Sequence, residues 1–345
     1  MTTTQTDHYV VKHRFTDFEE FSDAIHAWDL DFRQLDAGDS PAELTQVGTG
    51  RFQLTHACLN RKYDQYGGAP DGTRTFALLE TGVKGLIWCG RPVTDQTLLM
   101  FDSSGAFEAT SQPGFRVFTF ALPEDQLLET VQALGIQEPK QITYHSDNAI
   151  ELTPLAARNL HLRMVNIARV ATADPTVLNS PGFLEEFKYE LPGQLAEAIK
   201  LSETNPLRPA LRTRYKALKH ALDYINTSAD VAHTVRDLCR ATGVSERTLE
   251  YAFRERFGVT PKQYIRDIRL NAVHKILAKA ASEEAKVTDI ANQFGFWHMG
   301  QFAADYKRLF GKLPSEVLRE PYNKITKPRN ARCKITPVTD YASKS

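Results

Sequence analysis

Two stretches near the C-terminus, TVRDLCRATGVSERTLEYAFRERFGVTPKQY (residues 234–264) and KVTDIANQFGFWHMGQFAADYKRLFGKLPSEV (residues 286–317), follow one degenerate pattern. In both copies a small residue precedes a glycine by four positions, and apolar residues then recur at helical spacing. This pattern predicts a helix, a glycine turn and a second helix in each copy. The matched positions are Leu238 with Ile290, Cys239 with Ala291, Gly243 with Gly295, Leu249 with Phe302, Phe253 with Tyr306, Phe257-Gly258 with Phe310-Gly311, and Pro261 with Pro314.

The first copy contains the capping residues that such a motif needs. Thr234 with Asp237 forms a capping-box pattern, and Ser245 is a good N-cap for the second helix. The buried face of that second helix is predicted to hold Leu249, Phe253 and Phe257. Its outward face is then left to Glu246, Arg247, Glu250, Tyr251 and Arg254.

The segment YIRDIRLNAVHKILAKA (264–280) joins the two copies and predicts a long connecting helix. One helix-turn-helix pattern alone also fits an ordinary helical hairpin, whereas two in tandem are far less expected by chance. The second helix of such a motif enters the major groove of DNA, and two of them one turn apart, ~34 Å, would read adjacent grooves. The C-terminal half is therefore predicted to bind double-stranded DNA.

Charge is divided unevenly along the chain, although the 345 residues carry 42 Lys+Arg and 42 Asp+Glu. Residues 1–207 have a net charge of −12, and residues 208–345 have a net charge of +12. A basic half is what a polyanion binder needs, and it is also compatible with a solvated basic face. The charge by itself favours neither reading, so the motifs carry the prediction.

Residues 212 to about 320 resemble the AraC/XylS family of transcription regulators. The resemblance rests on GVSERTLEYAFRERFGVTPKQYIRDIRL (243–270) and GFWHMGQFAADYKRLFGKLPSEV (295–317). The second of these is similar to the subset that contains the ethanolamine-utilisation operon regulator. The family resemblance implies a C-terminal DNA-binding module, an N-terminal module for effector sensing and dimerisation, and activation of a catabolic operon.

Carried over residue by residue, the resemblance assigns base reading in the first recognition helix to Arg247, Glu250 and Tyr251. Arginine can grip guanine with two hydrogen bonds and glutamate can accept one from cytosine, while tyrosine can stack or contact a thymine methyl. The matching positions in the second helix are Met299, Gly300, Ala303 and Ala304, which lack hydrogen-bonding side chains, so the first helix is expected to dominate specificity. The predicted DNA-binding set is Ser245, Glu246, Arg247, Glu250, Tyr251, Arg254, His298, Met299, Gly300, Gln301 and Lys307, with Arg308 as a further phosphate ligand.

Aromatic and basic residues flank these positions. Phe296 and Trp297 are expected to pack in the core of the module. Arg266 and Arg269, on the connecting helix, are expected to reach phosphate. For Arg269 the alternative is to brace the two motifs through an acid such as Asp289.

The N-terminal half shows strand patterns followed by helical ones. After a polar segment of about 20 residues that suggests a loose arm, short β-branched and aromatic runs between about 51 and 121 predict an antiparallel barrel or sandwich. Helices are expected at 123–135, 153–170 and 182–201, the last broken at Pro192. An apolar face there fits either packing on the barrel or a dimer interface: Leu184, Phe187, Leu191, Leu195 and Ile199. The fold class is α+β, an N-terminal cupin-like antiparallel β-barrel with helices and a C-terminal all-α domain with two helix-turn-helix motifs.

An aromatic barrel interior suits a small organic ligand. The candidate effector-binding residues are Phe52, His56, Phe76, Trp88 and Phe118, and the resemblance suggests an amine or a corrinoid, adenosylcobalamin, as the effector. His56 and Cys58 share a strand face, where they fit a metal or corrinoid site or, as we favour, ordinary buried side chains. The chain lacks the His-x-His of metal cupins and any nucleophile, phosphate-loop or dinucleotide motif. We therefore expect no enzyme, no catalytic residue, no metal and no required cofactor.

The predicted domains are an effector-sensing and dimerisation domain (1–203), a linker (204–211), a DNA-binding domain (212–322) and a flexible basic tail (323–345). The sequence contains no run of 18 apolar residues and no apolar leader, and its four cysteines are scattered, so a cytoplasmic protein without membrane contact is expected. The expected partners are double-stranded DNA, RNA polymerase, a small-molecule effector and a second copy in a homodimer. Two alternatives remain, a cupin-type metal enzyme with an appended helical domain and a DNA binder that needs no ligand.

Overall fold

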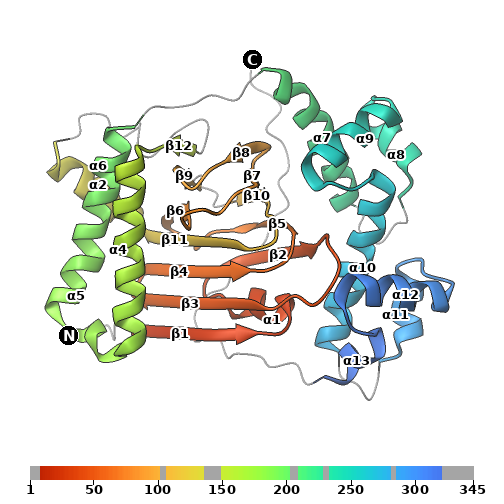
Figure 1. The fold of residues 1–345 in the computed structure, drawn as a ribbon, viewed down its shortest axis with the longest axis horizontal. Helices are drawn as coiled ribbons and strands as arrows, with labels where there is room; N and C mark the ends of the chain where they lie inside the picture. Colours follow the sequence, from red (N-terminus) through yellow and green to blue (C-terminus); the bar gives the residue numbers. More distant parts are fainter. Residues whose placement is uncertain are drawn as a thin grey trace.

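The described strands all lie in the N-terminal half of the chain, together with a layer of helices, and the C-terminal half is helical (Figure 1). The computed structural model describes residues 8–101, 106–135, 149–202, 209–227, 233–280 and 285–320. The strands are β1 (His8–Phe15), β2 (Asp29–Gln34), β3 (Ala42–Thr49), β4 (Phe52–Leu59), β5 (Tyr63–Gly68), β6 (Thr73–Leu79), β7 (Leu86–Trp88), β8 (Arg91–Val93), β9 (Thr97–Met100), β10 (Ala106–Thr110), β11 (Phe115–Pro123) and β12 (Ala149–Glu151). The helices of this half are α1 (Phe18–Ala24), α2 (Glu124–Ala133), α4 (Pro154–Ala173), η1 (Pro175–Asn179), α5 (Pro181–Glu185), η2 (Glu186–Glu190) and α6 (Leu191–Lys200).

The strands form two facing antiparallel sheets. A seven-stranded sheet has the order β1-β3-β4-β11-β6-β9-β12, and a five-stranded sheet has the order β2-β5-β10-β7-β8. Side chains alternate between the two faces of a strand. In the seven-stranded sheet one face is turned to the other sheet and the opposite face is covered by α4, α5 and α6 (Figure 1). Both faces of this sheet are therefore apolar, and the sequence pattern of its central strands does not show which face meets the other sheet and which meets the helices.

The helical layer on this sheet departs from the sequence expectation at one point. Pro192 does not break the segment, because η2 is a π-helical turn that leads directly into α6, and Pro192 stands in the first turn of α6. Phe187, Leu191 and Leu195 are fully buried under the sheet, so this face packs on the sandwich.

The N-terminal segment is not a loose arm from residue 8 onward. Strand β1 pairs with β3 along its whole length, from His8 opposite Thr49 to Phe15 opposite Ala42. Helix α1 buries Phe18 and Phe21 completely. The exposed polar residues Lys12, His13 and Arg14 belong to a paired strand, which composition alone does not distinguish from a disordered arm.

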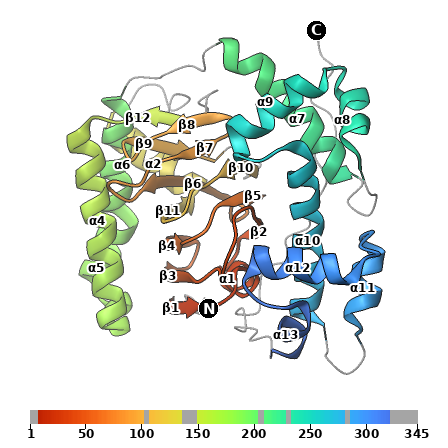
Figure 2. The same ribbon diagram turned by 45° about the vertical axis from the view of Figure 1, so that its right-hand side comes forward.

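The C-terminal half consists of α7 (Pro209–Thr227), α8 (Val235–Thr242), α9 (Glu246–Phe257), α10 (Pro261–Lys279), α11 (Val287–Gln293), α12 (Met299–Phe310) and α13 (Pro314–Arg319). Helices α8 and α9 form the first helix-turn-helix, α11 and α12 form the second, and α10 runs between them (Figure 2). The turn glycines Gly243 and Gly295 have φ of 68° and 74°, a backbone region that side chains with a Cβ rarely adopt.

The expected α+β fold class is confirmed, with antiparallel sheets before a helical domain that contains two helix-turn-helix motifs. Helix α7 begins at Pro209, inside the segment predicted as a linker (204–211), whose remaining residues 204–208 lie outside the described ranges. The predicted tail (323–345) also lies outside them. Within the described residues no helix is both long and apolar enough to cross a bilayer.

Candidate nucleic-acid interface

The start and the orientation of α9 follow from its sequence. Ser245 is the N-cap, and its side chain accepts a hydrogen bond from the Thr248 amide. Leu249, Phe253 and Phe257 are almost completely buried against α7, α8 and α10, so the opposite face of the helix points outward. The capping box of Thr234 with Asp237 begins α8 in the same way.

The outward face of α9 brings together the five residues predicted there. Glu246, Arg247, Glu250, Tyr251 and Arg254 line one open depression of about 700 Å³. The Tyr251 side chain is 56% exposed. Along the helix, the Arg247 guanidinium donates to the Tyr251 hydroxyl at 3.3 Å and lies over its ring. Arg254 donates to the Glu250 carboxylate at 3.0 Å. These i,i+4 pairs hold the polar ends in place on an open surface.

The predicted residues of the second motif stand at the start of α12 and along its exposed side. His298 is the residue before the helix and is exposed, as are Gly300, Gln301 and Lys307, whereas Met299 is half-buried. The Gln301 amide donates to Asp305 at 3.1 Å, and Arg308 pairs with the same carboxylate at 3.1 Å. This helix therefore offers small side chains in its first two turns and cations near its end.

A basic groove lies between the first motif and the connecting helix. It has a volume of about 470 Å³, and its lining includes Lys262, Arg266 and Arg269 of α10 together with His233 and Thr234 at the start of α8. The N-terminal ends of α8 and α10 meet there, and each helix start adds a partial positive charge. Lys262 and His233 were not part of the predicted set. Their positions beside the helix-capping residues Thr234 and Thr260 are the feature of the sequence that could have indicated them.

Asp267 and Asp305 partly neutralise the positive charge of Arg266 on α10. Arg266 lies 3.5 Å from the Asp267 carboxylate and 3.7 Å from that of Asp305. Burial raises the pKa of Asp267 to about 6, although Arg266 and Arg308 act against the rise. The sequence alone does not indicate these contacts, because Arg266 and Asp305 are far apart in the chain.

Of the two aromatic residues before α12, Phe296 lies in the interior and Trp297 on the surface. Phe296 is 9% exposed, and the Arg269 guanidinium lies over its ring, 4.8 Å from the ring centroid. Among the described residues Arg269 forms no ion pair with Asp289, the acid considered as its alternative partner. Trp297 is 71% exposed. The expectation of core packing is therefore correct for Phe296 and wrong for Trp297, because consecutive residues in this turn point in opposite directions.

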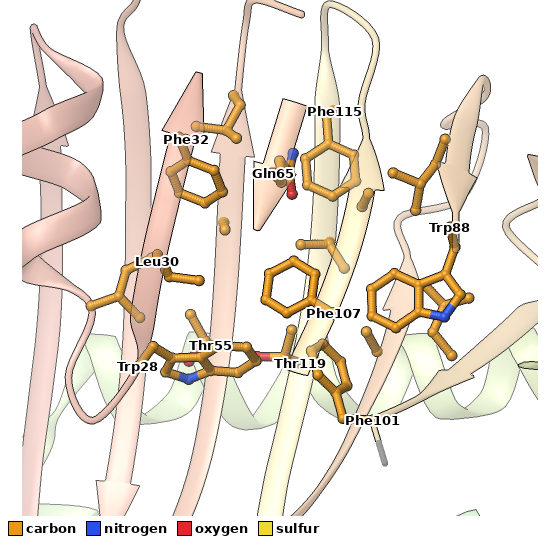
Figure 3. A pocket seen from close by; sticks show the side chains of 18 of the residues that line it. Trp28, Leu30, Phe32, Thr55, Gln65, Trp88, Phe101, Phe107, Phe115 and Thr119 are labelled. Atoms are coloured by element: carbon orange, nitrogen blue, oxygen red, sulfur yellow. The ribbon is translucent and has the colours of Figure 1, made fainter. Parts of the chain in front are cut away.

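A second candidate site is the cavity between the two sheets (Figure 3). Its volume is about 60 Å³, and its lining is aromatic and aliphatic apart from Thr55, Gln65 and Thr119. The lining aromatic residues are Phe21, Trp28, Phe32, Trp88, Phe101, Phe107 and Phe115. Trp88 and Phe107 stack with ring centroids 5.5 Å apart, and Phe101 meets Phe107 edge-on at 5.2 Å. None of the described residues that line this cavity is charged.

Of the five predicted effector residues, Trp88 alone lines this cavity. Phe52, Phe76 and Phe118 lie on the opposite face of the seven-stranded sheet, in the core beneath the helical layer. The expectation that these three line this cavity is therefore wrong. Strand alternation is the reason, since Thr55 and Ala57 of β4 face the cavity and their even-numbered neighbours face the helices.

His56 and Cys58 also lie on the helix side of that sheet. The His56 ring stacks on Phe118 at 4.2 Å and its Nε2 lies 3.4 Å from the Glu80 carboxylate. Burial raises the pKa of the Cys58 thiol to about 12 and lowers that of His56. Among the described residues there is no group of three or more His, Cys, Asp or Glu side chains placed to hold a metal.

One wall of the cavity is also the surface on which the DNA-binding half rests. On β5 and β10, Gln65, Phe107 and Ala109 face the cavity. Their neighbours along the same strands face the helices: the Tyr264 hydroxyl donates to Asp64 at 2.5 Å, and Arg256 donates to Thr110 at 3.0 Å.

Glu108 joins two helices to that wall. It pairs with Arg256 of α9 at 3.5 Å and accepts a hydrogen bond from Tyr215 of α7. Burial would lower the pKa of Arg256, but Glu108 and Asp64 raise it above its usual value. Arg256 is therefore a cation held on the inner side of the first recognition helix.

A buried ion pair fixes the second motif to the N-terminal half. The His274 Nε2 of α10 lies 2.8 Å from the Asp17 carboxylate, and its Nδ1 lies 2.7 Å from the Tyr306 hydroxyl of α12. Nearby, the Gln34 side chain donates to the Leu309 backbone carbonyl, and the Gln34 backbone N–H donates to the Asn271 side-chain oxygen. The sandwich therefore contacts both motifs from behind, and the outward faces of α9 and α12 stay open.

The folded arrangement defines a tandem helix-turn-helix module seated on a double-sheet domain, and comparisons with known proteins match the helical module. A family model described as a helix-turn-helix domain matches residues 238–320. The probable thc operon regulatory protein of Rhodococcus erythropolis is 37% identical over 120 residues, 35% of this chain and 34% of that protein. XylDLEGF operon transcriptional activator 2 of Pseudomonas putida is 30% identical over 124 residues, 35% of this chain and 79% of that protein.

A solved structure, a probable AraC family transcriptional regulator from Rhodopseudomonas palustris, is 31% identical and covers 30% of this chain and 95% of that chain, with a TM-score of 0.28. The match to the Pseudomonas activator, which is 30% identical over 79% of that protein, shows that this chain belongs to the AraC/XylS family of transcriptional regulators. The match to the Rhodococcus protein spans about a third of that protein's length.

Proposed function

We propose that the protein is a sequence-specific DNA-binding regulator that activates a catabolic operon in response to a small molecule. The observation that carries this proposal is the orientation of α9, whose reader residues share one open depression while its back is fixed by Arg256 to the sandwich. Two of the similar proteins are named as operon regulators or activators, which supports activation. RNA polymerase is then the expected partner, in the cytoplasm.

The chemistry of the cavity favours a neutral, largely apolar effector. A cationic amine would find no charged partner among the described lining residues, and burying an unpaired charge is strongly unfavourable. A cavity of about 60 Å³ also does not hold a corrinoid without rearrangement. The ethanolamine subset remains a hypothesis, supported by the GFWHMGQF stretch of the DNA-binding half.

The cavity wall offers a route from effector to DNA. A ligand that presses on Phe107 or Ala109 moves the strand that carries Glu108 and Thr110, and these hold Arg256 of α9. An effector with different affinities for two arrangements of this strand shifts the population of DNA-competent protein. Ala109→Leu is expected to abolish the response to the effector and to leave basal DNA binding in place, with Ala121→Leu, which is buried outside the cavity, as the matched control.

Self-association is part of the proposal. Leu155 and Leu162 lie seven residues apart on α4 and are 68% and 53% exposed. Helix α4 itself lies on the side of the molecule away from the DNA-binding half (Figure 1). Residues at this spacing share one helix face. Sedimentation of the full-length protein and of Leu162→Glu tests this, since the substitution is expected to yield monomers.

The proposal as a whole is tested by footprinting the full-length protein on the DNA of its own organism, with and without neutral aromatic compounds and amines. Discrete sites beside a catabolic operon, strengthened by one compound, are expected. Uniform, salt-sensitive affinity for all sequences would support a ligand-independent architectural binder instead. Stoichiometric metal in the purified protein would support the metal-enzyme alternative.

A further inference from the structure

Trp297 is held outward by the residue before it. The Phe296 ring packs against Phe302, with ring centroids 5.1 Å apart, and beneath the Arg269 guanidinium. The Phe296 amide also donates to the Ala291 carbonyl at 3.0 Å. Because these contacts fix the turn with Phe296 inside, Trp297 projects into solvent and is 71% exposed. The other two tryptophans, Trp28 and Trp88, are 7% and 4% exposed.

Trp297 lies two residues before α12, and the exposed face of the first two turns of that helix carries small or uncharged side chains. Within α12, Gly300 and Ala304 are both exposed and stand four residues apart, which places them on the same helix face. A Cβ added at Gly300 would meet no atom within 4 Å, so nothing from the rest of the described chain covers that position. The exposed cations Lys307 and Arg308 stand at the end of this face.

We propose that Trp297 contacts DNA bases in the major groove read by the second motif, with its ring against thymine methyl groups. This inference rests on the proposed function, because it concerns the same DNA complex. Gly300 and Ala304 allow the backbone of α12 to approach the bases closely, and a flat apolar side chain at its start supplies the contact that the small residues do not. The methyl group of thymine is the apolar feature of the major groove edge.

Charge favours DNA over a protein partner at this face. Lys307 and Arg308 follow the small residues at the end of α12. The basic groove with Lys262, Arg266 and Arg269 lies along α10, whose Arg269 contacts Phe296, the residue before Trp297. Cations beside an uncharged helix face suit DNA, because phosphate contacts position a protein while base contacts give specificity. The second motif thus reads sequence through apolar contact, and the first motif reads it through hydrogen bonds.

The first test uses DNA duplexes enriched from a random pool by the full-length wild-type protein. Trp297→Ala is expected to weaken binding to these duplexes roughly tenfold, and Trp297→Phe is expected to retain most of the affinity. Replacing thymine by uracil in the half-site of the second motif removes only the methyl group. That replacement is expected to weaken wild-type binding about fourfold and to have no effect on Trp297→Ala. Tyr189→Ala removes a half-exposed aromatic ring from the remote N-terminal half and is the matched control.

The second test uses the fluorescence of the protein itself. Since Trp28 and Trp88 are buried, acrylamide quenching reports mainly Trp297, and Trp297→Phe is expected to remove most of the quenchable signal. Enriched duplex is expected to protect the wild-type signal from quenching.

Three results would overturn the inference. They are unchanged quenching on an enriched duplex, equal thymine-to-uracil effects in wild type and Trp297→Ala, and normal DNA binding by Trp297→Ala with lost activation of transcription, which would assign the tryptophan to a protein partner. Failure of the wild-type protein to enrich any sequence would instead refute the proposed function, and the inference with it.

Discussion

Arg247 and Tyr251 show how single residues of the first recognition helix are prepared for DNA. In the free protein Arg247 lies over the Tyr251 ring and donates to its hydroxyl, while Arg254 donates a hydrogen bond to the Glu250 carboxylate. In the proposed DNA complex these exposed pairs, which are each worth little, would be exchanged for contacts to bases. These weak pairs thus order the side chains in the free protein and leave them able to change partners.

Arg247→Ala is expected to weaken specific binding by ~1–3 kcal/mol and to relax one base position, because a bidentate contact to guanine is lost. Titration of the variant against all four bases at each position of an enriched site measures this. Arg236→Ala, an exposed arginine of α8, is the control. An equal loss of affinity for every sequence would mean that Arg247 contacts phosphate.

At the scale of the element, the cap of α9 decides whether the recognition helix begins at the right residue. Ser245 accepts from the Thr248 amide, and Ser245→Ala is expected to lower the free energy of unfolding by about 1 kcal/mol. Ser245→Asp keeps the cap and adds a negative charge at the helix start, so stability is expected to be retained while DNA binding weakens. Urea denaturation and DNA titration separate the two effects. Equal stability of all three proteins would contradict the capping role.

Elements differ in how far their sequence predicts them. The caps, the left-handed glycines and the buried face of α9 are local features, so both helix-turn-helix motifs could be predicted. Strand β1 was not predicted, because its outward polar residues have meaning only beside β3. The π-helical turn before Pro192 was missed for a similar reason, since it depends on packing against the sheet.

At the scale of the whole molecule, the buried pair of Asp17 and His274 couples the two halves to pH. Burial acts to lower the pKa of His274, but Asp17 raises it above 6.5; burial acts to raise the pKa of Asp17, but His274 lowers it below 3.8. Glu19, Lys312 and the Tyr306 hydroxyl also face this pair. The His274 contribution to stability is therefore complete below pH 6.5 and is lost as the pH rises through its raised folded value. The Asp17 contribution is present above its usual pKa and is lost as the pH falls through the lowered one.

Asp17→Asn tests this coupling, because asparagine keeps the N-cap of α1 and removes the charge. The variant is expected to lower the free energy of unfolding by on the order of 3 kcal/mol at pH 6, and by less at pH 9, where a neutral imidazole needs no counter-ion. Urea denaturation across this range measures the difference. Parallel pH profiles of wild type and Asp17→Asn would show that the pair does not titrate in this way.

The sequence by itself determined the DNA-binding half: its two motifs, the caps of the first motif, the connecting helix and the open face of α9 all follow from local propensity and helical spacing. The tertiary structure alone decided which strand face encloses the cavity, that Trp297 points outward, and that Arg256, Tyr264 and His274 fix the module to the sandwich. The physical reason is distance along the chain. Contacts such as Asp17 with His274 join residues that local sequence rules do not relate, and a strand that is apolar on both faces does not reveal which face holds a ligand.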